Sequence, residues 1–185
     1  MPDDRPILSI VVPVYNEEDN LRPLTDAIRE AMKTVGVTYE VVLTDDGSKD
    51  RSWEIMKQLA ATDTRIRVQR FEFNCGETAA SEAGMRAARG KYVVTIDADL
   101  QNDPKDLPGF LEALKTYDCV CGTRVASRGE GDNWIRIASS RIANWVRNSL
   151  SEENITDAGC TYRAFKRECI AVSYTHLTLP TIYSV

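Results

Sequence analysis

Short apolar runs alternate with amphipathic segments along most of the chain. The apolar runs predict β-strands at residues 7–14, 39–44, 66–71, 92–96 and 119–122. Between them, apolar residues recur at helical spacing, which predicts helices within residues 21–35, 53–60, 77–89 and 107–117. Strands that alternate with helices of about twelve residues are typical of an α/β fold with a mostly parallel sheet.

Glycines and small residues add local detail to this pattern. Gly36 and Gly90 follow two of the predicted helices, at a position where glycine commonly ends a helix. Residues 77–89 are rich in alanine, so we expect this helix to approach the sheet closely. Residues 163–171 indicate the start of a further helix.

The composition is that of an ordinary globular domain. The chain has 185 residues with a net charge of −5, and 43% of its residues are hydrophobic. This balance argues against a disordered chain and against a general nucleic-acid binder, which needs an excess of lysine and arginine. No stretch has the roughly 18 consecutive apolar residues of a membrane span, and no leader peptide is visible. We therefore expect one domain in the cytoplasm.

The five cysteines lack the spacing of a metal site. They are Cys75, Cys119, Cys121, Cys160 and Cys169. An odd number of cysteines fits reduced thiols better than a set of disulfides, so we expect small, buried core residues.

The last residues differ from the rest of the chain. Residues 172–185 contain no Asp, Glu, Lys or Arg, and they carry His176, the only histidine. The segment VSYTHLTLPT is similar to the translation of a common sequencing-library adapter. We expect the natural domain to cover residues 1–171, incomplete at its end, and residues 172–185 to be non-native; a natural β-strand is the alternative. His176 is accordingly given no functional role.

Polar side chains follow three of the predicted strands, at the point where each of these strands ends. These positions are Asn16-Glu17, Asp45-Asp46 and Asp97-Ala98-Asp99. In an open parallel sheet, ligands bind beyond the carboxyl ends of the strands, so the three groups indicate one site. For Asp45-Asp46-Gly47-Ser48, a turn followed by a helix cap is the alternative.

Asp97 and Asp99 are the candidate metal ligands. At the end of a strand, residues two apart lie on one face, so both carboxylates are expected on the same side, and a divalent cation would relieve the repulsion between them. Gln101 continues the alternation and can add a carbonyl oxygen. Such oxygen ligands suit Mg²⁺ or Mn²⁺. The sequence has no glycine-rich phosphate loop, which suggests that the metal neutralises a diphosphate.

Several ordered motifs resemble one enzyme family. They are SIVVPVYNEEDNL, VVLTDDGSKD, ARGKYVVTIDADLQNDP, CGTR and DAGCTYRAFKRE, together with the helix after FNCGETAA. Over residues 6–171 the chain resembles the inverting glycosyltransferases of family 2, and in particular the branch that transfers sugars to polyprenyl phosphates. The resemblance implies a GT-A fold, which is a Rossmann-like α/β fold with a mostly parallel sheet flanked by helices.

The resemblance also implies roles for the residues of the strand-end loops. A nucleotide-diphosphate sugar would be bound by Pro13, Tyr15, Glu17, Thr44, Asp46, Asp97, Ala98, Asp99 and Arg124. Within this set, Thr44 and Asp46 would surround the base. Asp97 and Asp99, with Gln101, would hold the metal. Cys75 stands where the family usually has an aromatic residue, and we expect it to pack in the core.

The acceptor side would be built from the later part of the chain. A lipid phosphate is mostly ionised at neutral pH, so it needs cationic positioning more than a general base. The candidates are Arg124, Arg128, Arg136 and Arg141, although a solvated face of an amphipathic helix explains each of them as well. Asp157 could orient or deprotonate the acceptor, or be an ordinary loop residue.

The leading hypothesis is therefore a metal-dependent, inverting transferase at the cytoplasmic face of a membrane. It would move a sugar from a nucleotide-diphosphate sugar to a polyprenyl phosphate. One alternative is a family 2 enzyme with a saccharide acceptor, which would need a positioned base. Another is a nucleotide-sugar-binding module without turnover, against which the Asp97 and Asp99 pair argues.

Overall fold

The computed structural model describes residues 5–122 and 161–170. Within these residues, six strands form one sheet in the order β3-β2-β1-β4-β6-β5. The strands are β1 (Leu8–Val14), β2 (Tyr39–Asp45), β3 (Ile66–Arg70), β4 (Tyr92–Thr95), β5 (Cys119–Cys121) and β6 (Arg163–Lys166). Strands β1 to β4 are parallel, and β6 is antiparallel to β4. The expected α/β architecture is confirmed.

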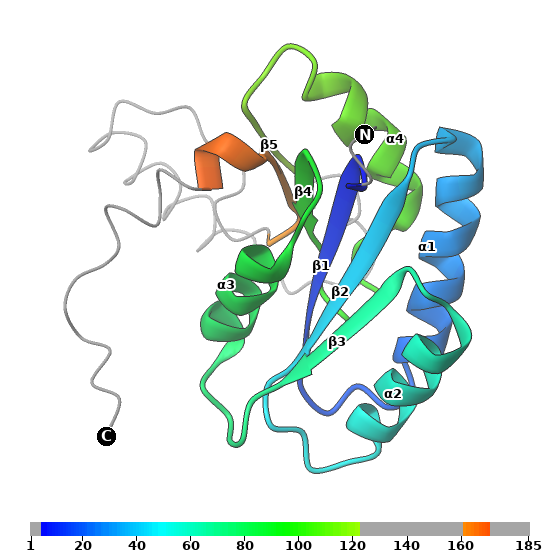
Figure 1. Ribbon diagram of the computed structural model, residues 1–185, viewed down its shortest axis with the longest axis vertical. Helices are drawn as coiled ribbons and strands as arrows, with labels where there is room; N and C mark the ends of the chain where they lie inside the picture. The colour runs from blue at the N-terminus through cyan, green and yellow to red at the C-terminus, as the bar shows by residue number, and fades with distance from the viewer. Residues whose placement is uncertain (1–4, 123–160, 171–185) are drawn as a thin grey trace, which may run out of the picture. The chain divides into compact units, whose positions relative to one another are not determined.

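Helices cover both faces of this sheet (Figure 1). They are α1 (Leu21–Val35), α2 (Ser52–Thr62), α3 (Glu77–Ala87) and α4 (Leu107–Ala113), and a 3₁₀ turn, η1 (Pro104–Asp106), precedes α4. Helix α1 contacts α2 and α4, whereas α3 packs against β1 and β2. None of the helices in the described ranges is both long and apolar enough to cross a membrane.

Helix α1 shows why the apolar period predicted so much of the fold. Its buried side chains include Leu21, Leu24, Ile28 and Met32, which recur every three or four residues on the face toward the sheet. Gly36 ends the helix with a φ of 67°, and its N–H donates to the carbonyl of Met32. Glycine adopts this left-handed conformation without strain, so the predicted C-terminal cap is confirmed.

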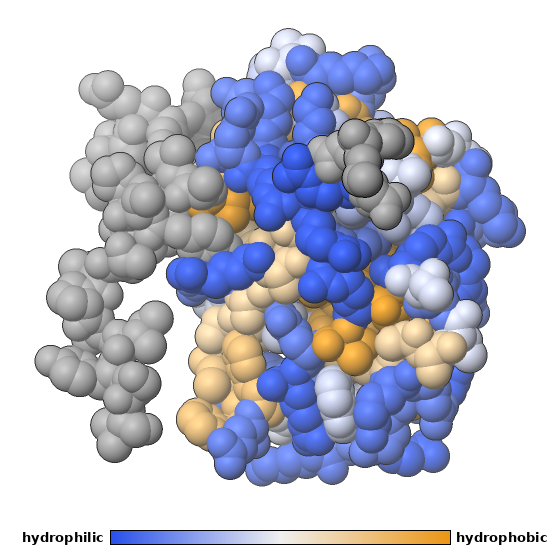
Figure 2. Space-filling model, in the orientation of Figure 1, coloured by the Kyte–Doolittle hydropathy of each residue, from blue (hydrophilic) through white to orange (hydrophobic). Residues whose placement is uncertain are grey.

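Helix α3 approaches the sheet as its small residues predict, and its surface is the pale apolar area at the lower left of Figure 2. A Cβ added at Gly84 would lie 2.4 Å from Cγ1 of Val11. The predicted cap at Gly90 is wrong, because the helix ends at Ala87 and Ala88 is already extended. Gly90 is instead required by packing: a Cβ there would lie 2.6 Å from the backbone nitrogen of Ser9.

The helix expected to begin at residue 163 is also corrected. Residues Arg163–Lys166 form strand β6, in which Arg163 pairs with Thr95 and Lys166 pairs with Tyr92. The chain becomes helical only at Arg167. Ala164 pairs with Val94 of β4 and is fully buried, so this pairing extends the core at that edge of the sheet. That non-local gain outweighs the local helical preference.

The four cysteines that the structure describes do not form part of the core, contrary to expectation. Cys75, Cys119 and Cys121 are exposed, and Cys169 is half-buried. These four are free thiols in the structure, and Cys160 lies outside the described residues. The exposed positions are in the loop after β3 and on β5, at the margin of the sheet, where a small residue has little to pack against.

A buried carboxylate links several segments at the amino edge of the sheet, the edge at which the parallel strands begin. Glu40 is 2% exposed and accepts hydrogen bonds from Ser9 Oγ at 2.7 Å and from Arg89 Nε at 2.9 Å. Arg67 donates to the same carboxylate at 3.1 Å and to the carbonyl of Ala87 at 2.8 Å. Burial raises the pKa of Glu40, but the hydrogen bonds outweigh it and hold the pKa below its ordinary value.

Replacing Glu40 with glutamine should lower the free energy of unfolding by about 2 kcal/mol at neutral pH. The two arginines lose a charged acceptor, although their partial exposure reduces the cost. Because the pKa of Glu40 is lowered by folding, its stabilisation is present above the ordinary pKa of 4.5 and is lost as the pH falls.

Urea unfolding at neutral pH and near pH 3 checks this prediction. The difference in the free energy of unfolding between the wild type and the Glu40→Gln variant should be smaller near pH 3. Some acid sensitivity should persist in the variant, because a hydrogen bond from Arg65 lowers the pKa of Asp63 to about 2. If the two free energies of unfolding differ equally at both pH values, the stabilisation by Glu40 does not come from its charge.

Candidate functional site

The loops that follow β1, β2 and β4 lie at one edge of the sheet, at the lower end of the strands in Figure 1. Val14 at the end of β1 pairs with Asp45 at the end of β2, and Val11 pairs with Thr95 at the end of β4. The carboxyl ends of parallel strands thus converge as the sequence predicted. This edge holds the candidate site.

Hydrogen bonds join the loop after β1 to the loop after β2. The N–H of Asn16 donates to Ser48 Oγ at 2.9 Å, and Asn16 Oδ1 accepts from the N–H of Lys49 at 2.8 Å. The N–H of Glu17 donates to Ser52 Oγ at 2.9 Å. Asn16 has a φ of 56°, so the chain turns sharply after the strand. These bonds give the edge a fixed backbone before any ligand binds.

The first-loop residues implied by the resemblance occupy different environments. Pro13 is buried within β1, where it pairs with Thr44. The Glu17 carboxylate accepts a hydrogen bond from Asn20 Nδ2 at 2.7 Å. Tyr15 is 41% exposed, which is high for a large apolar ring. Tyr15 is therefore the member of this group whose ring is open to a ligand.

Asp45 forms the turn that the sequence left as an alternative. It is fully buried, and its Oδ1 accepts from the N–H of Ser48 at 3.0 Å. Its Oδ2 lies 2.9 Å from Nε of Arg70, which is an ion pair between the ends of β2 and β3. Arg70 also donates to the carbonyl of Ser48 at 3.0 Å. Asp45 thus shapes the loop and is not available to a ligand.

Asp46 holds the loop that follows β3. It is 2% exposed, and its carboxylate accepts from the N–H of Cys75 at 2.7 Å and from the N–H of Gly76 at 2.9 Å. Asn74 Nδ2 donates to it as well, at 3.0 Å. In this structure the oxygens implied to contact a base are engaged by protein donors. The same bonds leave the side chain of Cys75 exposed, so its expected core packing is wrong.

Thr44 lies beneath these loops. It is fully buried, and its hydroxyl accepts a hydrogen bond from Gln69 Nε2 at 2.8 Å. A Cβ added at Gly84 would lie 3.1 Å from this hydroxyl, so helix α3 closes over it. Thr44 therefore supports the strand-end loops from within the core.

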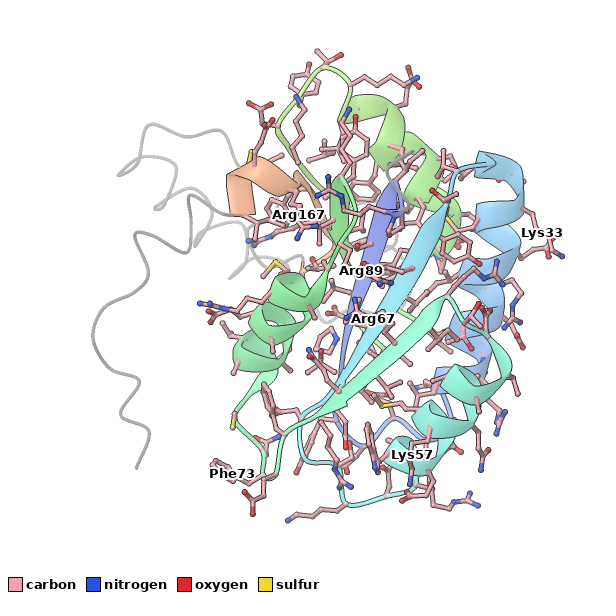
Figure 3. The ribbon with its side chains drawn as sticks, in the orientation of Figure 1. Lys33, Lys57, Arg67, Phe73, Arg89 and Arg167 are labelled. Atoms are coloured by element: carbon pink, nitrogen blue, oxygen red, sulfur yellow. The ribbon has the colours of Figure 1, made fainter. Side chains whose placement is uncertain are left out.

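Gly47 links the two loops through close packing. Its φ is +70°, and a Cβ there would lie 2.6 Å from the carbonyl carbon of Phe73 and 2.7 Å from the backbone nitrogen of Asn74. The loop after β3 therefore passes directly over this glycine. Phe73 itself is 68% exposed and projects from the carboxyl edge (Figure 3).

Replacing Gly47 with alanine should lower the free energy of unfolding by at least about 1–2 kcal/mol, the strain of a left-handed alanine, with the backbone clash in addition. Chemical denaturation measures this difference. Gly109 on α4 provides a matched control, since a Cβ there meets nothing within 4 Å and its φ is not positive. A Gly47→Ala protein as stable as the Gly109→Ala protein would contradict the close packing.

The segment after β4 carries the candidate metal ligands. Asp97 and Asp99 are both half-buried, and Ala98 between them is 4% exposed. The chain turns at Ala98 and Asp99, and Leu100 has a φ of 62°. The argument that strand alternation puts both carboxylates on one face is therefore wrong, because the strand ends at Thr95. The turn now determines how they present their oxygens.

Hydrogen bonds fix this turn. Asp97 Oδ2 accepts from Asn102 Nδ2 at 3.2 Å, and Asp99 Oδ1 accepts from the N–H of Gln101 at 3.0 Å. Asn102 is 5% exposed, and Gln101 is exposed. The sequence analysis assigned no role to Asn102 or to Arg70. The only sequence signals were the polar Asn102-Asp103-Pro104 run and a cation at the end of a strand.

The donor set fits a divalent metal that is shared with a substrate. Among residues 5–122 and 161–170, no group of three or more His, Cys, Asp or Glu side chains could form a metal cage. Mg²⁺ commonly uses one or two carboxylates, several waters and substrate phosphate oxygens. Asp97 and Asp99 supply two carboxylates at the edge, which meets that requirement. The side chain of Gln101 is exposed and can supply a further oxygen.

The predicted acceptor residues lie outside the part of the chain that the structure describes. They are Arg124, Arg128, Arg136, Arg141 and Asp157, and the same holds for residues 172–185 with His176. The site described here is consequently the part formed by the loops after β1 to β4.

Comparison with known proteins identifies the family. A family model described as "Glycosyl transferase family 2" matches residues 9–172. The chain belongs to glycosyl transferase family 2. The resemblance found in the strand-end motifs is thereby confirmed.

Curated relatives support the same family. The chain is 37% identical over 169 residues to an undecaprenyl-phosphate 4-deoxy-4-formamido-L-arabinose transferase from Aeromonas hydrophila. The aligned part covers 90% of the chain and 51% of the relative. It is 34% identical over 166 residues to a dodecaprenyl-phosphate galacturonate synthase from Rhizobium johnstonii, with 88% of the chain and 48% of the relative covered. The chain thus spans about half the length of these family 2 relatives.

Solved structures confirm the GT-A fold. A mannosyltransferase from Pyrobaculum calidifontis, in complex with GDP-Man and Mn²⁺, matches with a TM-score of 0.65 at 23% identity. The match covers 93% of this chain and 48% of that structure. At this identity the likeness establishes the arrangement of strands and helices in this family 2 chain.

Proposed function

We propose that this chain carries the donor-binding part of a glycosyltransferase that moves a sugar from a nucleotide-diphosphate sugar to a polyprenyl phosphate. One observation carries the proposal. Asp97 and Asp99 follow β4 at the edge where the loops after β1 and β2 are already fixed by hydrogen bonds. The polyprenyl-phosphate acceptor is supported by the names of relatives that cover about 90% of the chain.

At this edge the donor would be bound both through a metal held by carboxylates and through residues that contact the nucleotide directly. Asp97 and Asp99, with Gln101, would hold Mg²⁺ or Mn²⁺, which when bound neutralises the charge of the leaving diphosphate. Tyr15 offers an exposed ring after β1. Asp46 maintains the loop of residues 74–76 that would border the nucleotide.

The transfer itself would be a displacement with inversion at the anomeric carbon. An oxygen of the lipid phosphate forms the new C–O bond, and the bond to the nucleotide diphosphate breaks with its electrons on the leaving group. An ionised phosphate needs no strong base, so the acceptor side would require cations. Arg124, Arg128, Arg136 and Arg141 remain the proposed candidates, with Asp157 as a proposed orienting residue. A membrane surface is the proposed source of the lipid.

A transfer assay tests this proposal. The protein is incubated with a panel of UDP- and GDP-sugars, Mn²⁺ and undecaprenyl phosphate in detergent, and lipid-linked sugar is detected by mass spectrometry. Asp157→Asn distinguishes the acceptor class, because it should have a mild effect with a phosphate acceptor and nearly abolish transfer to a saccharide. Product formed only on saccharides would overturn the lipid acceptor. Donor binding without even slow hydrolysis of any donor in the panel would favour a binding module.

A further inference from the structure

A hollow lined by basic side chains lies at the opposite end of the sheet from the candidate site. It has a volume of about 440 Å³, and its basic lining residues are Arg5, Arg89, Lys91, Lys166 and Arg167. Glu168 is the one acidic residue in its lining. Lys166 pairs with Tyr92 near the start of β4, which places the hollow at the amino edge. Strand β1 has seven residues, so about 20 Å separates the two edges.

Hydrogen bonds of the backbone hold the basic residues in place. The N–H of Arg167 donates to the carbonyl of Lys91 at 3.0 Å, which joins the chain after β6 to the chain before β4. The N–H of Gly90 donates to Ser9 Oγ at 2.8 Å, and the N–H of Arg89 donates to the buried Glu40 at 2.7 Å. The hollow is therefore preorganised, because none of these bonds uses the side chains that line it.

The cations differ in how far the protein already neutralises them. Arg89 is paired with Glu40 at 2.9 Å, and Lys166 is paired with Asp118 at 2.6 Å. Lys91 lies over the ring of Tyr92, 5.2 Å from its centre. Arg167 is exposed, and within the described part of the chain no carboxylate lies at ion-pair distance from it. Lys91 and Arg167 thus present positive charge to solvent in a chain of net charge −5.

We propose that this hollow binds a phosphate-bearing anion, separately from the nucleotide-sugar donor. A phosphate group carries about 1.5–2 negative charges and three acceptor oxygens, which matches several cations around one concavity. An arginine guanidinium can bind two phosphate oxygens side by side, and an adjacent lysine adds a point charge. Figure 3 shows Arg167 and Arg89 near one another at this edge, and the surface there is strongly hydrophilic in Figure 2.

The phosphate could belong to a soluble metabolite or to an anionic lipid headgroup, and two measurements separate these sources. Inorganic phosphate is titrated against chloride at equal ionic strength, with EDTA present so that no metal-dependent binding at the carboxyl edge contributes. Vesicles of phosphatidic acid in phosphatidylcholine, compared with pure phosphatidylcholine, are used in co-sedimentation. Both use the 185-residue chain.

The decisive variant is Lys91→Gln with Arg167→Gln, which removes both of the unneutralised cations and keeps the backbone bond between these residues. Lys33→Gln with Lys57→Gln is the matched control, since it removes the same charge from α1 and α2 (Figure 3). We expect phosphate or vesicle affinity to fall roughly tenfold for each cation removed at the hollow, and to be unchanged in the control. Circular dichroism establishes that both variants are folded.

Each result decides the proposal. Phosphate binding that the hollow variant loses supports a soluble ligand, and vesicle binding that it alone loses supports a lipid headgroup. Binding that falls equally in the hollow variant and in the control would show a diffuse charge effect and overturn the site. An absence of both phosphate and vesicle binding would overturn it as well.

Discussion

Replacing Asp99 with asparagine should reduce the affinity for a nucleotide-diphosphate sugar in the presence of Mn²⁺ by at least about a hundredfold. Removing a group that merely orients a metal ligand typically costs 10–100-fold in metal affinity or activity, so loss of a ligand itself should cost more. The fold should survive. Asp99 is half-buried in a turn after β4, and an asparagine oxygen can still accept the hydrogen bond from the N–H of Gln101.

Calorimetry with and without Mn²⁺ measures this loss. In EDTA the wild type should bind the donor as weakly as the Asp99→Asn protein, because both then lack the bound metal. Asp106→Asn is the matched control, since Asp106 is an exposed aspartate on the nearby η1 turn. Unchanged donor affinity of the Asp99→Asn protein in Mn²⁺ would remove Asp99 from the metal site.

The elements that the sequence predicted are those in which one periodic face is buried. In α1 the residues Leu21, Leu24, Ile28 and Met32 are all buried toward the core, and the helix bounds agree with the pattern. Strand β6 was missed because its four residues gain their stability from β4, far earlier in the chain. The periodicity of apolar residues within a short segment cannot indicate such a pairing. The basic residues around β6 are instead typical of a surface helix.

The candidate site could be located from the sequence for a similar reason. Parallel strands bring their carboxyl ends to one edge whatever the loops contain, so Asp46 and Asp97 had to lie there. The partners of these carboxylates could not be predicted. Asn74 donates to Asp46 from another loop, and Asn102 donates to Asp97 across a turn. Such bonds depend on loop conformations, which no spacing rule determines.

Among these carboxylates, Asp46 is the one whose unpredicted hydrogen bonds should matter most for stability. From the sequence, Asp46→Ala would weaken a contact to the nucleotide base rather than the metal site. In the structure the carboxylate accepts hydrogen bonds from the N–H groups of Cys75 and Gly76 and from Asn74 Nδ2. Hydrogen bonds to a charged group contribute about 1.5–3 kcal/mol each, and they are not additive. We expect Asp46→Ala to lower the free energy of unfolding by about 4 kcal/mol.

Urea unfolding tests the structural part of this expectation. Asp103→Ala is the control, because the Asp103 carboxylate is exposed and accepts from the N–H of Lys105 at 2.9 Å. That variant should lose less than about 1 kcal/mol. An Asp46→Ala protein as stable as the control would show that the loop of residues 74–76 does not depend on this carboxylate.

Binding measurements then separate the two roles of Asp46. If it acts through the loop, Asn74→Ala should also weaken nucleotide binding, because one of the bonds that hold the loop is lost while the carboxylate remains. If it contacts the base directly, Asn74→Ala should bind the nucleotide as the wild type does. In either case affinity for inorganic diphosphate with Mn²⁺ should barely change, since Asp97 and Asp99 follow a different strand. Equal weakening of nucleotide and diphosphate by Asp46→Ala would instead place Asp46 in the metal site.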